Sequence, residues 1–170
     1  TMSEQEIAAA QLSTLDELTL ISNRRGFITL AQYSLNFCKR NKSNATLLFF
    51  DLDGFKAIND SFGHAEGDKA LIAFAEVMRK IFRNSDVFAR LGGDEFVALL
   101  SDTDEANITD ALARFKQSLD DYNKQANRGY DLQYSVGYSH FSCQQDSSID
   151  DLLEQADSEM YKHKIEKQLS

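Results

Sequence analysis

Two short acidic stretches contain residues that could bind a metal ion. Asp51 and Asp53 follow a continuous apolar run, residues 46–50, which is typical of a buried strand. Asp94 and Glu95 follow a pair of glycines. Carboxylate oxygens suit hard cations such as Mg²⁺ or Mn²⁺, and these ions normally share a phosphate of the substrate. The pattern therefore predicts metal-assisted phosphate chemistry, provided that the fold brings the two stretches together.

Each stretch has a simpler interpretation when it is taken alone. An Asp-x-Asp pair can merely end a strand, and an acid after two glycines can merely belong to a turn. An EF-hand is a poor fit, because Phe55 would occupy the third ligand position and Gly54 comes too early in the loop. If the stretches meet, two metal ions about 4 Å apart could polarise an attacking hydroxyl and neutralise a pyrophosphate leaving group.

The hydrophobic pattern predicts the elements that would position these acids. Helices are expected near residues 23–40, 70–82, 108–122 and 152–160, and strands near 46–50, 86–91, 95–100 and 132–139. Gly92-Gly93 predicts a hairpin turn, because glycine tolerates positive φ. Without the outer helices the order is β-α-β-β-α-β, a ferredoxin-like α+β fold with a mostly antiparallel central sheet flanked by helices. The second hairpin strand then lies between the first two strands, which places Asp94 and Glu95 beside Asp51.

Composition excludes several other classes of protein. A chain of 170 residues suits one globular domain, and its net charge of −9 argues against binding of nucleic acid, which requires a basic face. No apolar run approaches the ~20 residues of a membrane span, so no direct membrane contact is expected. The two cysteines, Cys38 and Cys143, do not have the spacing of a zinc site or a disulfide framework. A reduced, cytoplasmic location is expected.

The N-terminal residues are expected to lie outside the main domain. Residues 1–15 are interpreted as the stub of an upstream linker or signalling helix, and residues 16–170 as the catalytic domain. Three leucines at the junction are spaced like one helical stripe: Leu12, Leu15 and Leu18. Asp16 is expected to form a structural ion pair with Arg24 or Arg25.

The acidic stretches and their surroundings resemble the diguanylate cyclase family. Residues 92–96 spell GGDEF, the signature of that family. Residues 50–60, FDLDGFKAIND, and residues 62–68, FGHAEGD, are similar to two further family segments. DELT at 16–19 and SVG at 135–137 also resemble family motifs, and the blocks occur in the family's order. The chain is thus identified as a GGDEF domain, related to the palm folds of nucleotide cyclases and polymerases.

The resemblance implies a reaction and a set of catalytic residues. Family members condense two GTP molecules into cyclic di-GMP and release two pyrophosphates, with Mg²⁺ or Mn²⁺. By resemblance, Asp51, the backbone carbonyl of Leu52 and Asp94 would hold the metal. Asp94 or Glu95 would be the base for the ribose 3′-hydroxyl, and the sequence does not separate the two. Lys56 would place a cation against the phosphates.

The resemblance also implies which residues bind guanine. Asn59 and Asp68 would contact the base, because a carboxylate can accept from both N1–H and the exocyclic amine of guanine. Taken alone, Asp68 would be an acid in the first turn of a helix, where it interacts with the macrodipole. His64 lies between them and would line the base pocket, or else remain solvated.

The phosphates of GTP have their own implied partners. Gly54 and Phe55 would offer backbone N–H groups, and Lys164 would be a second phosphate-binding lysine, with a solvated helix face as the alternative. Where the family commonly has an arginine, four positions further on, this chain has Gln168. Lys167 could substitute, although lysine lacks the bidentate fork of arginine.

A third implied site would bind the product. Arg83-Asn84-Ser85-Asp86 resembles the family's inhibitory RxxD motif, and Arg114 falls where a supporting arginine is often found. A salt bridge on the surface is the alternative interpretation of RxxD. The family resemblance further implies a catalytic homodimer and an upstream sensory domain. A catalytically weak or inactive domain that binds cyclic di-GMP or GTP and regulates a partner remains the alternative function.

Overall fold

The structure, a computed structural model, describes residues 3–6 and 13–169, and a four-stranded sheet forms its centre. The strands are β1 (Ala45–Leu52), β2 (Val87–Gly92), β3 (Glu95–Ser101) and β4 (Tyr134–Phe141). They lie in the order β2-β3-β1-β4, and each neighbouring pair is antiparallel. The helices are α2 (Arg24–Asn41), α3 (Phe55–Phe62), α4 (His64–Ile81), α5 (Glu105–Ala126) and α6 (Ile149–Leu169). The expected α+β class, with its β-α-β-β-α-β core, is confirmed.

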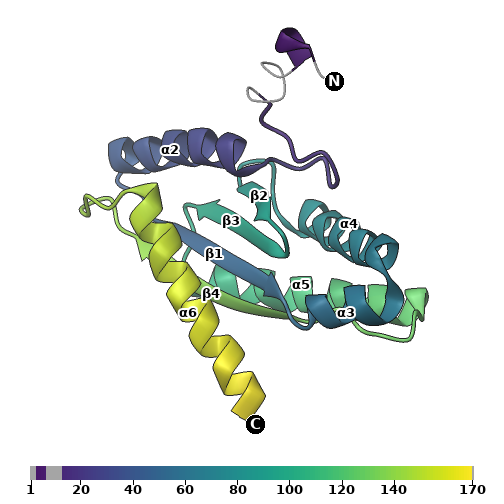
Figure 1. Ribbon diagram of the computed structural model, residues 1–170. Helices are drawn as coiled ribbons and strands as arrows, with labels where there is room; N and C mark the ends of the chain where they lie inside the picture. Colours follow the sequence, from purple (N-terminus) through teal and green to yellow (C-terminus); the bar gives the residue numbers. More distant parts are fainter. Residues whose placement is uncertain (1–2, 7–12, 170) are drawn as a thin grey trace.

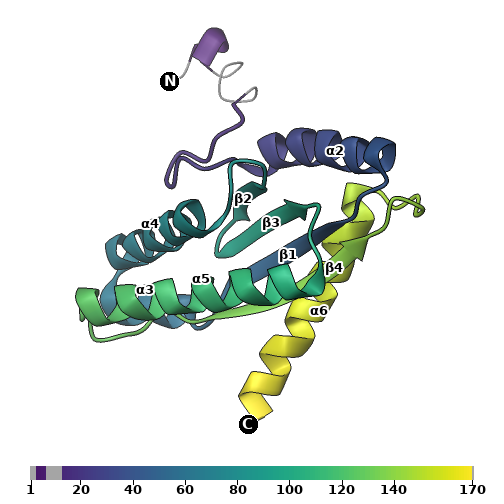
Figure 2. The same cartoon turned by 180° about the vertical axis from the view of Figure 1, so that it is seen from behind.

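Helices cover both faces of the sheet, so the molecule has two hydrophobic cores. Figure 1 shows α6 in front of the sheet, and Figure 2, from behind, shows α5 in front. Successive side chains of β1 alternate between the faces, as the period of a strand requires. Leu48, Phe50 and Leu52 pack with α4 and α5, whereas Leu47 and Phe49 pack with α2 and α6. This burial on both faces explains the continuous apolar run and holds β1 rigidly.

Aromatic rings fix the end of β1 that carries the acids. The ring of Phe50 stacks on Phe115 of α5 with centroids 5.2 Å apart, and it meets Phe74 of α4 edge-on at 5.8 Å. Aromatic pairs at such distances add about 1 kcal/mol each beyond the area that they bury. Asp51 therefore follows directly after one of the most firmly packed residues of the chain.

The turn between β2 and β3 has the conformation that its glycines predict. Gly92 and Gly93 have φ values of 150° and 50°, in the region that favours glycine. In the resulting register Asp51 lies opposite Glu95. The expected placement of the hairpin beside the end of β1 is confirmed.

The N-terminal segment does not form the helical stripe that its leucines suggest. Leu15 forms a β-bridge with Ser22, and Leu18 lies in a turn, whereas Leu12 falls outside the described residues. The segment folds back because Ile21 is buried and Leu18 packs against the core. Of the two leucines that the structure describes, Leu18 packs on the domain and Leu15 is exposed, so the stripe prediction is wrong for residues 15–18.

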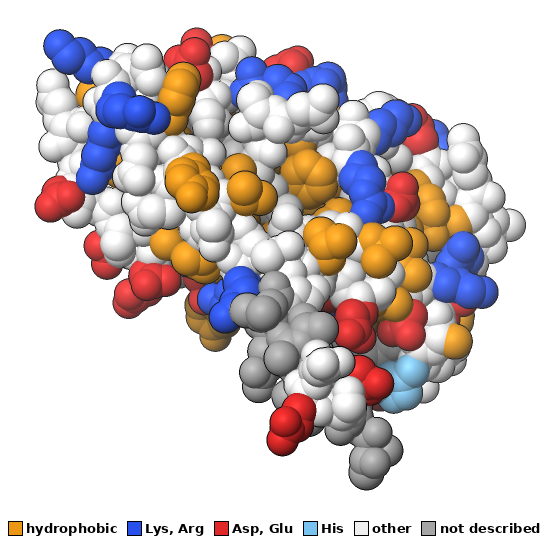
Figure 3. Space-filling view, turned by 90° about the horizontal axis from the view of Figure 1, so that it is seen from above, with side chains coloured by type: hydrophobic (Ala, Val, Ile, Leu, Met, Phe, Trp, Pro, Cys, Tyr) orange, Lys and Arg blue, Asp and Glu red, His pale blue; other side chains and the backbone are white. Residues whose placement is uncertain are grey.

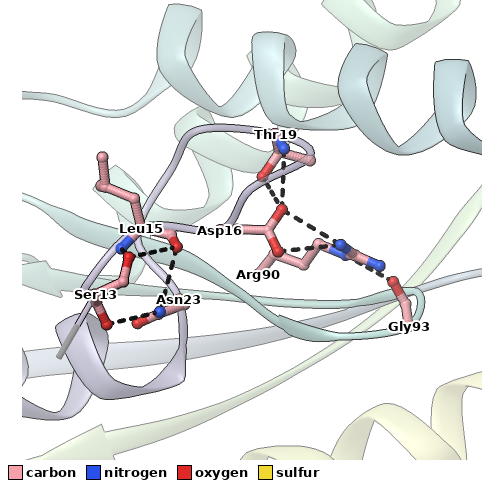
Figure 4. A network of polar contacts seen from close by, with 7 residues as sticks. All are labelled: Ser13, Leu15, Asp16, Thr19, Asn23, Arg90 and Gly93. Carbon is pink, nitrogen blue, oxygen red and sulfur yellow. Dashed lines mark hydrogen bonds and ion pairs between the residues drawn. The ribbon is translucent and has the colours of Figure 1, made fainter. Parts of the chain in front are cut away.

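Asp16 has a different ion-pair partner from the one expected. Its carboxylate accepts from the N–H and Oγ1 of Thr19, at 2.9 and 2.6 Å, and from Nη1 of Arg90 at 3.1 Å. Arg90 Nε also donates to the carbonyl oxygen of Gly93 at 2.9 Å, as Figure 4 shows. Burial tends to raise the pKa of Asp16, but the bonds from Thr19 and the charge of Arg90 outweigh it, so this pKa is lowered. Asp16 thus joins the N-terminal turn to the hairpin, where Arg24 or Arg25 had been expected as its partner.

The outer face of α2 carries a stripe of apolar side chains among polar ones. Leu30, Tyr33 and Phe37 are 47%, 69% and 54% exposed, and Leu20 beside them is 63% exposed. Figure 3 looks down on this side of the molecule and shows apolar side chains gathered on it. Leu20 also has a φ of 64°, a left-handed conformation that costs a leucine about 1–2 kcal/mol.

No helix among the described residues has both the length and the apolar character needed to cross a membrane.

Candidate functional site

The fold brings the two acidic stretches together at one edge of the sheet. The N–H of Leu52 donates to the carbonyl oxygen of Asp94 at 3.2 Å, and Asp51 pairs with Glu95 across the strands. Asp51, Asp94 and Glu95 are each partly buried. The convergence that the topology predicts is thus present, about 43 positions apart in sequence.

Burial, together with repulsion between neighbouring carboxylates, raises the pKa of two acids in this cluster. Burial, followed by contact with Asp51 and its negative charge, raises the pKa of Asp94 to about 7. Burial also raises the pKa of Glu95, and the charges of Asp157 and Asp51 add to this effect. Such perturbed acids in one cluster are typical of a functional site, because the fold holds them at an electrostatic cost.

Asp157 is a member of this acidic cluster that the sequence analysis did not identify. It lies on α6, and its pKa is raised first by burial and then by the charge of Asp51. Asp157 and Lys164 are seven residues apart, which is two helical turns, so they share one face of α6. Once Lys164 is assigned to the site, this spacing in the sequence predicts that Asp157 faces the same site.

The acidic cluster fits a divalent cation. Oδ1 of Asp51 is buried and has no hydrogen-bond partner among the described residues. A cation would satisfy this oxygen and relieve its repulsion with Asp94. Across residues 3–6 and 13–169, no group of three or more His, Cys, Asp or Glu side chains is arranged to hold a metal by itself. Two carboxylates would therefore need other oxygens, such as the carbonyl of Leu52 or a substrate phosphate.

Helix α6 contributes a lysine to the cluster. Lys164 Nζ donates to Oδ2 of Asp51 at 3.0 Å, and its side chain is 28% exposed. Burial tends to lower the pKa of Lys164, but the hydrogen bond and the charges of Asp51, Asp53 and Asp94 raise it overall. Lys164 is therefore a cation within the cluster, so the alternative of a solvated helix face is wrong.

Lys167 reaches the same edge of the sheet but contacts different groups. Its Nζ bonds to Oδ2 of Asp53 and to the carbonyl oxygen of Tyr134, the latter at 2.6 Å. Asp53 also accepts from Oγ of Ser135 at 2.7 Å. Asp53 thus helps to attach α6 and β4 to the end of β1, while Asp51 remains the acid nearer to Asp94.

The phosphate-binding candidates lie where β1 leads into α3. Gly54 has a φ of 66°, which lets the chain turn sharply from the strand into the helix that begins at Phe55. Lys56 lies in the first turn of α3 and is exposed. The N-terminus of this helix, beside the acidic cluster, offers backbone N–H groups and a positive dipole end to an anion.

The guanine-binding candidates lie on two helices that meet at Gly63. Asn59 belongs to α3, and Asp68 belongs to α4, where it is exposed. The side chain of Asn59 lies directly over Gly67, since a Cβ built on Gly67 would be 1.8 Å from Oδ1 of Asn59. Asn59 therefore lies against the residue that precedes Asp68. His64 begins α4 and is exposed, so the fold leaves it at the edge of this region.

The three residues of the implied product site also come together, at the far end of β2 from the acidic cluster. Arg83, Asp86 and Arg114 line a small cavity of about 150 Å³. Arg83 Nη2 bonds to Oδ1 of Asp86 at 3.1 Å, and Asp86 also accepts the N–H of Arg83 at 2.9 Å. The side chain of Asp86 is 2% exposed, whereas that of Arg83 is 56% exposed. Asp86 fixes the turn, and Arg83 and Arg114 present the accessible charge.

Comparison with known proteins agrees with this architecture. The family model described as "Diguanylate cyclase, GGDEF domain" matches residues 13–169. The probable diguanylate cyclase DgcC of Escherichia coli (strain K12) is 35% identical over 153 residues, which cover 90% of this chain and 41% of DgcC. The chain thus spans about two fifths of the length of that relative.

Solved structures show the same fold. The GGDEF domain of PA1120 (TpbB or YfiN) from Pseudomonas aeruginosa is 32% identical, with a TM-score of 0.79 and 89% of each chain covered. A microbial GGDEF domain, described for its interaction with cyclic di-GMP, is 29% identical, with a TM-score of 0.76 and coverage of 90% of this chain and 94% of that one. The chain therefore belongs to the diguanylate cyclase family of GGDEF domains.

Proposed function

We propose that this chain is a catalytic domain that condenses two GTP molecules into cyclic di-GMP and releases two pyrophosphates. The observation that carries the proposal is the β1–β3 register, which places Asp94 and Glu95 beside Asp51 and its unsatisfied Oδ1. A divalent cation would relieve the repulsion within this acidic cluster, and the phosphates of a nucleoside triphosphate would supply further oxygen ligands to that cation. Relatives that are named diguanylate cyclases support the same reaction.

Asp51, the carbonyl of Leu52 and Asp94 would hold Mg²⁺ or Mn²⁺. When bound, the ion would polarise the attacking hydroxyl and neutralise charge on the pyrophosphate. Glu95 then suits the role of base for the ribose 3′-hydroxyl, because burial raises its pKa while Asp94 is committed to the cation. Lys164 would exchange its bond to Asp51 for the triphosphate.

The remaining candidates would hold the substrate. Gly54 and Phe55 would direct backbone N–H groups at the phosphates, with Lys56 beside them in the first turn of α3. Asn59 and Asp68 would hydrogen-bond guanine, and His64 would border the base. One domain holds one GTP, so two domains must face each other for each 3′-hydroxyl to approach the α-phosphate of the other molecule.

The proposal is tested by incubating the protein with GTP and Mg²⁺ at several protein concentrations and detecting cyclic di-GMP by mass. We expect the rate per molecule to rise with concentration, because two domains must meet. The Asp94→Ala variant should make no product, since the acidic cluster loses a cation ligand. Asp146→Ala removes a carboxylate that is fully exposed and remote from the cluster, and it should behave as wild type. Equal rates in Asp94→Ala and wild type would contradict the proposal.

We also propose that cyclic di-GMP restrains the enzyme at Arg83, Asp86 and Arg114. Arginine can grip the Hoogsteen edge of guanine with a bidentate pair of bonds, and Arg83 is exposed enough to do so. Arg83→Ala should leave the initial rate unchanged and raise the inhibitory concentration of cyclic di-GMP about tenfold or more, equivalent to ~1.4 kcal/mol. In this variant the backbone N–H of residue 83 would still donate a hydrogen bond to Asp86. Lys80→Ala, a nearby exposed cation, serves as the control, and unchanged inhibition in Arg83→Ala would refute the assignment.

A regulatory binding domain is the second candidate function. It is favoured by the C-terminal end of α6, where Gln168 stands in place of the family's arginine and Lys167 is bonded to Asp53 and Tyr134. Both features would weaken the grip on a triphosphate. Absence of product at every protein concentration, together with binding of cyclic di-GMP that Arg83→Ala removes, would establish this second function.

A further inference from the structure

Helix α3 is weakly attached to the rest of the domain. It has eight residues, of which Ile58 is the buried one, and among the described elements it packs chiefly against α4. Yet α3 carries Asn59, whose position relative to Asp68 on α4 determines which base edge the pair can contact. Another contact is needed to fix the angle at which α3 and α4 meet.

A segment far away in sequence supplies that contact on the side of α3. Residues 128–130 belong to the connection between α5 and β4. The ring of Tyr130 lies against the ring of Phe62, the last residue of α3, with centroids 4.8 Å apart. Gly129 has a φ of 87° and lies under Phe62, because a Cβ at this position would be 3.4 Å from Cε1 of that ring. The end of α3 therefore packs on this segment.

The same segment holds the first turns of α4. Oε1 of Glu66 accepts from the hydroxyl of Tyr130 and from Nη1 of Arg128, both at 2.9 Å. The side chains of Glu66 and Arg128 are 20% and 31% exposed, so this ion pair is partly shielded from water. The hydrogen bond from Tyr130 lowers the pKa of Glu66, so the carboxylate stays ionised and paired near neutral pH. Arg128 also lies over the ring of Tyr122 on α5, 5.8 Å from its centroid.

These contacts flank the guanine-binding candidates on both helices. Phe62 follows Asn59 by three residues on α3, and Glu66 precedes Asp68 by two residues on α4. Between them, the side chain of Asn59 lies directly on Gly67 and leaves no room for a Cβ at that position. A change in the angle between α3 and α4 would move Asn59 across Gly67 and away from Asp68.

We propose that Arg128, Gly129 and Tyr130, acting on Phe62 and Glu66, form a brace that positions Asn59 relative to Asp68 and so determines the preference for guanine. This inference rests on the proposed function, because it concerns the base of the same nucleotide. The five brace residues are positioning residues, because they act through Asn59 and Asp68. The brace predicts that its loss changes nucleotide affinity and selectivity more than it changes turnover.

The brace is tested by calorimetric titration with α,β-methylene analogues of GTP and ATP, which bind but cannot be condensed. Tyr130→Ala removes both the ring contact and the hydrogen bond, and we expect it to weaken binding of the GTP analogue about tenfold and to reduce its preference over the ATP analogue. Tyr130→Phe keeps the ring and should lose less. Turnover assays should show KM raised with kcat within about twofold, since the acidic cluster is untouched. Tyr33→Ala and Tyr33→Phe, on an exposed tyrosine of α2, provide matched controls.

The outcomes separate the brace from the proposed function. Failure of wild type to bind the GTP analogue would overturn the proposed function. Wild-type binding with unchanged affinity and selectivity in both Tyr130 variants would overturn the brace alone. Should Tyr130→Ala fail to fold, Tyr130→Phe decides: it loses the hydrogen bond to Glu66 and should lose part of the selectivity, whereas unchanged selectivity would overturn the brace. Glu66→Gln keeps a hydrogen-bond acceptor for Tyr130 and Arg128, so it should retain more of the selectivity than Tyr130→Phe, and a larger loss in Glu66→Gln would contradict the geometry of the brace.

Discussion

The Gly137→Ala variant should unfold at a much lower urea concentration than the wild-type protein. Gly137 lies in β4, where α6 packs directly on the strand. A Cβ at this position would be 2.0 Å from the backbone N of Met160 and 2.4 Å from the carbonyl oxygen of Ala156. Backbone cannot rotate away as a side chain can, so the helix must move, and we expect a loss of about 3 kcal/mol in the free energy of unfolding. Equilibrium unfolding in urea, followed by circular dichroism, measures it.

Displacement of α6 in Gly137→Ala should also disturb the acidic cluster. Lys164 reaches Asp51 from the same helix, one turn after Met160. Under conditions where the variant remains folded, its affinity for the GTP analogue should therefore fall as well. An unchanged urea midpoint would show that α6 and β4 are not packed as closely as the structure has them.

The Gly67→Ala variant should differ from Gly137→Ala in stability: we expect it to keep normal stability and yet bind the GTP analogue poorly. The added methyl meets Oδ1 of Asn59, which is the end of a side chain and can rotate away. Alanine also favours a helix over glycine by about 1 kcal/mol, so the urea midpoint should stay the same or rise. If Asn59 binds guanine as proposed, its rotation removes a contact with the base, and affinity for the GTP analogue should fall about tenfold, or ~1.4 kcal/mol.

A double-mutant cycle isolates the cause in Gly67→Ala. If the methyl acts by displacing Asn59, then Asn59→Ala should weaken binding in the wild-type background and have little further effect in the Gly67→Ala background. Additive losses from the two substitutions would refute the mechanism. In the stability measurement the two glycine variants serve as controls for each other, because each adds one methyl group at a tightly packed position.

The meeting of the acidic stretches could be predicted because it depends on chain order and strand direction alone. Once Gly92-Gly93 is assigned to a hairpin, the β-α-β-β-α-β order brings Asp94 back to the end of β1. The burial of β1 on both faces likewise follows from its uninterrupted apolar residues. Predictions from local sequence patterns are correct where the packing of the whole sheet favours the same structure.

Contacts between side chains on different elements could not be predicted in this way. Asp16 finds Arg90, 74 positions away, because the N-terminal segment folds back over β2 instead of continuing as a helix. Asp157 joins the acidic cluster only because α6 crosses the end of β1. Helix α3 could not be predicted, because eight residues with one buried side chain contain too few apolar positions to show the helical period.

Because the side chain of Arg90 bonds to both segments, we expect the N-terminal turn and the β2–β3 hairpin to open and close together. A single guanidinium contacts both Asp16 and the carbonyl of Gly93, so local unfolding of either segment breaks a bond that orients Arg90 for the other. Their backbone amides should therefore exchange with deuterium at a common rate, as one cooperative unit that differs from the rest of β2 and β3. The N-terminal turn and the hairpin that carries Asp94 should thus behave as one cooperative unit, although Asp16 and Arg90 are 74 positions apart.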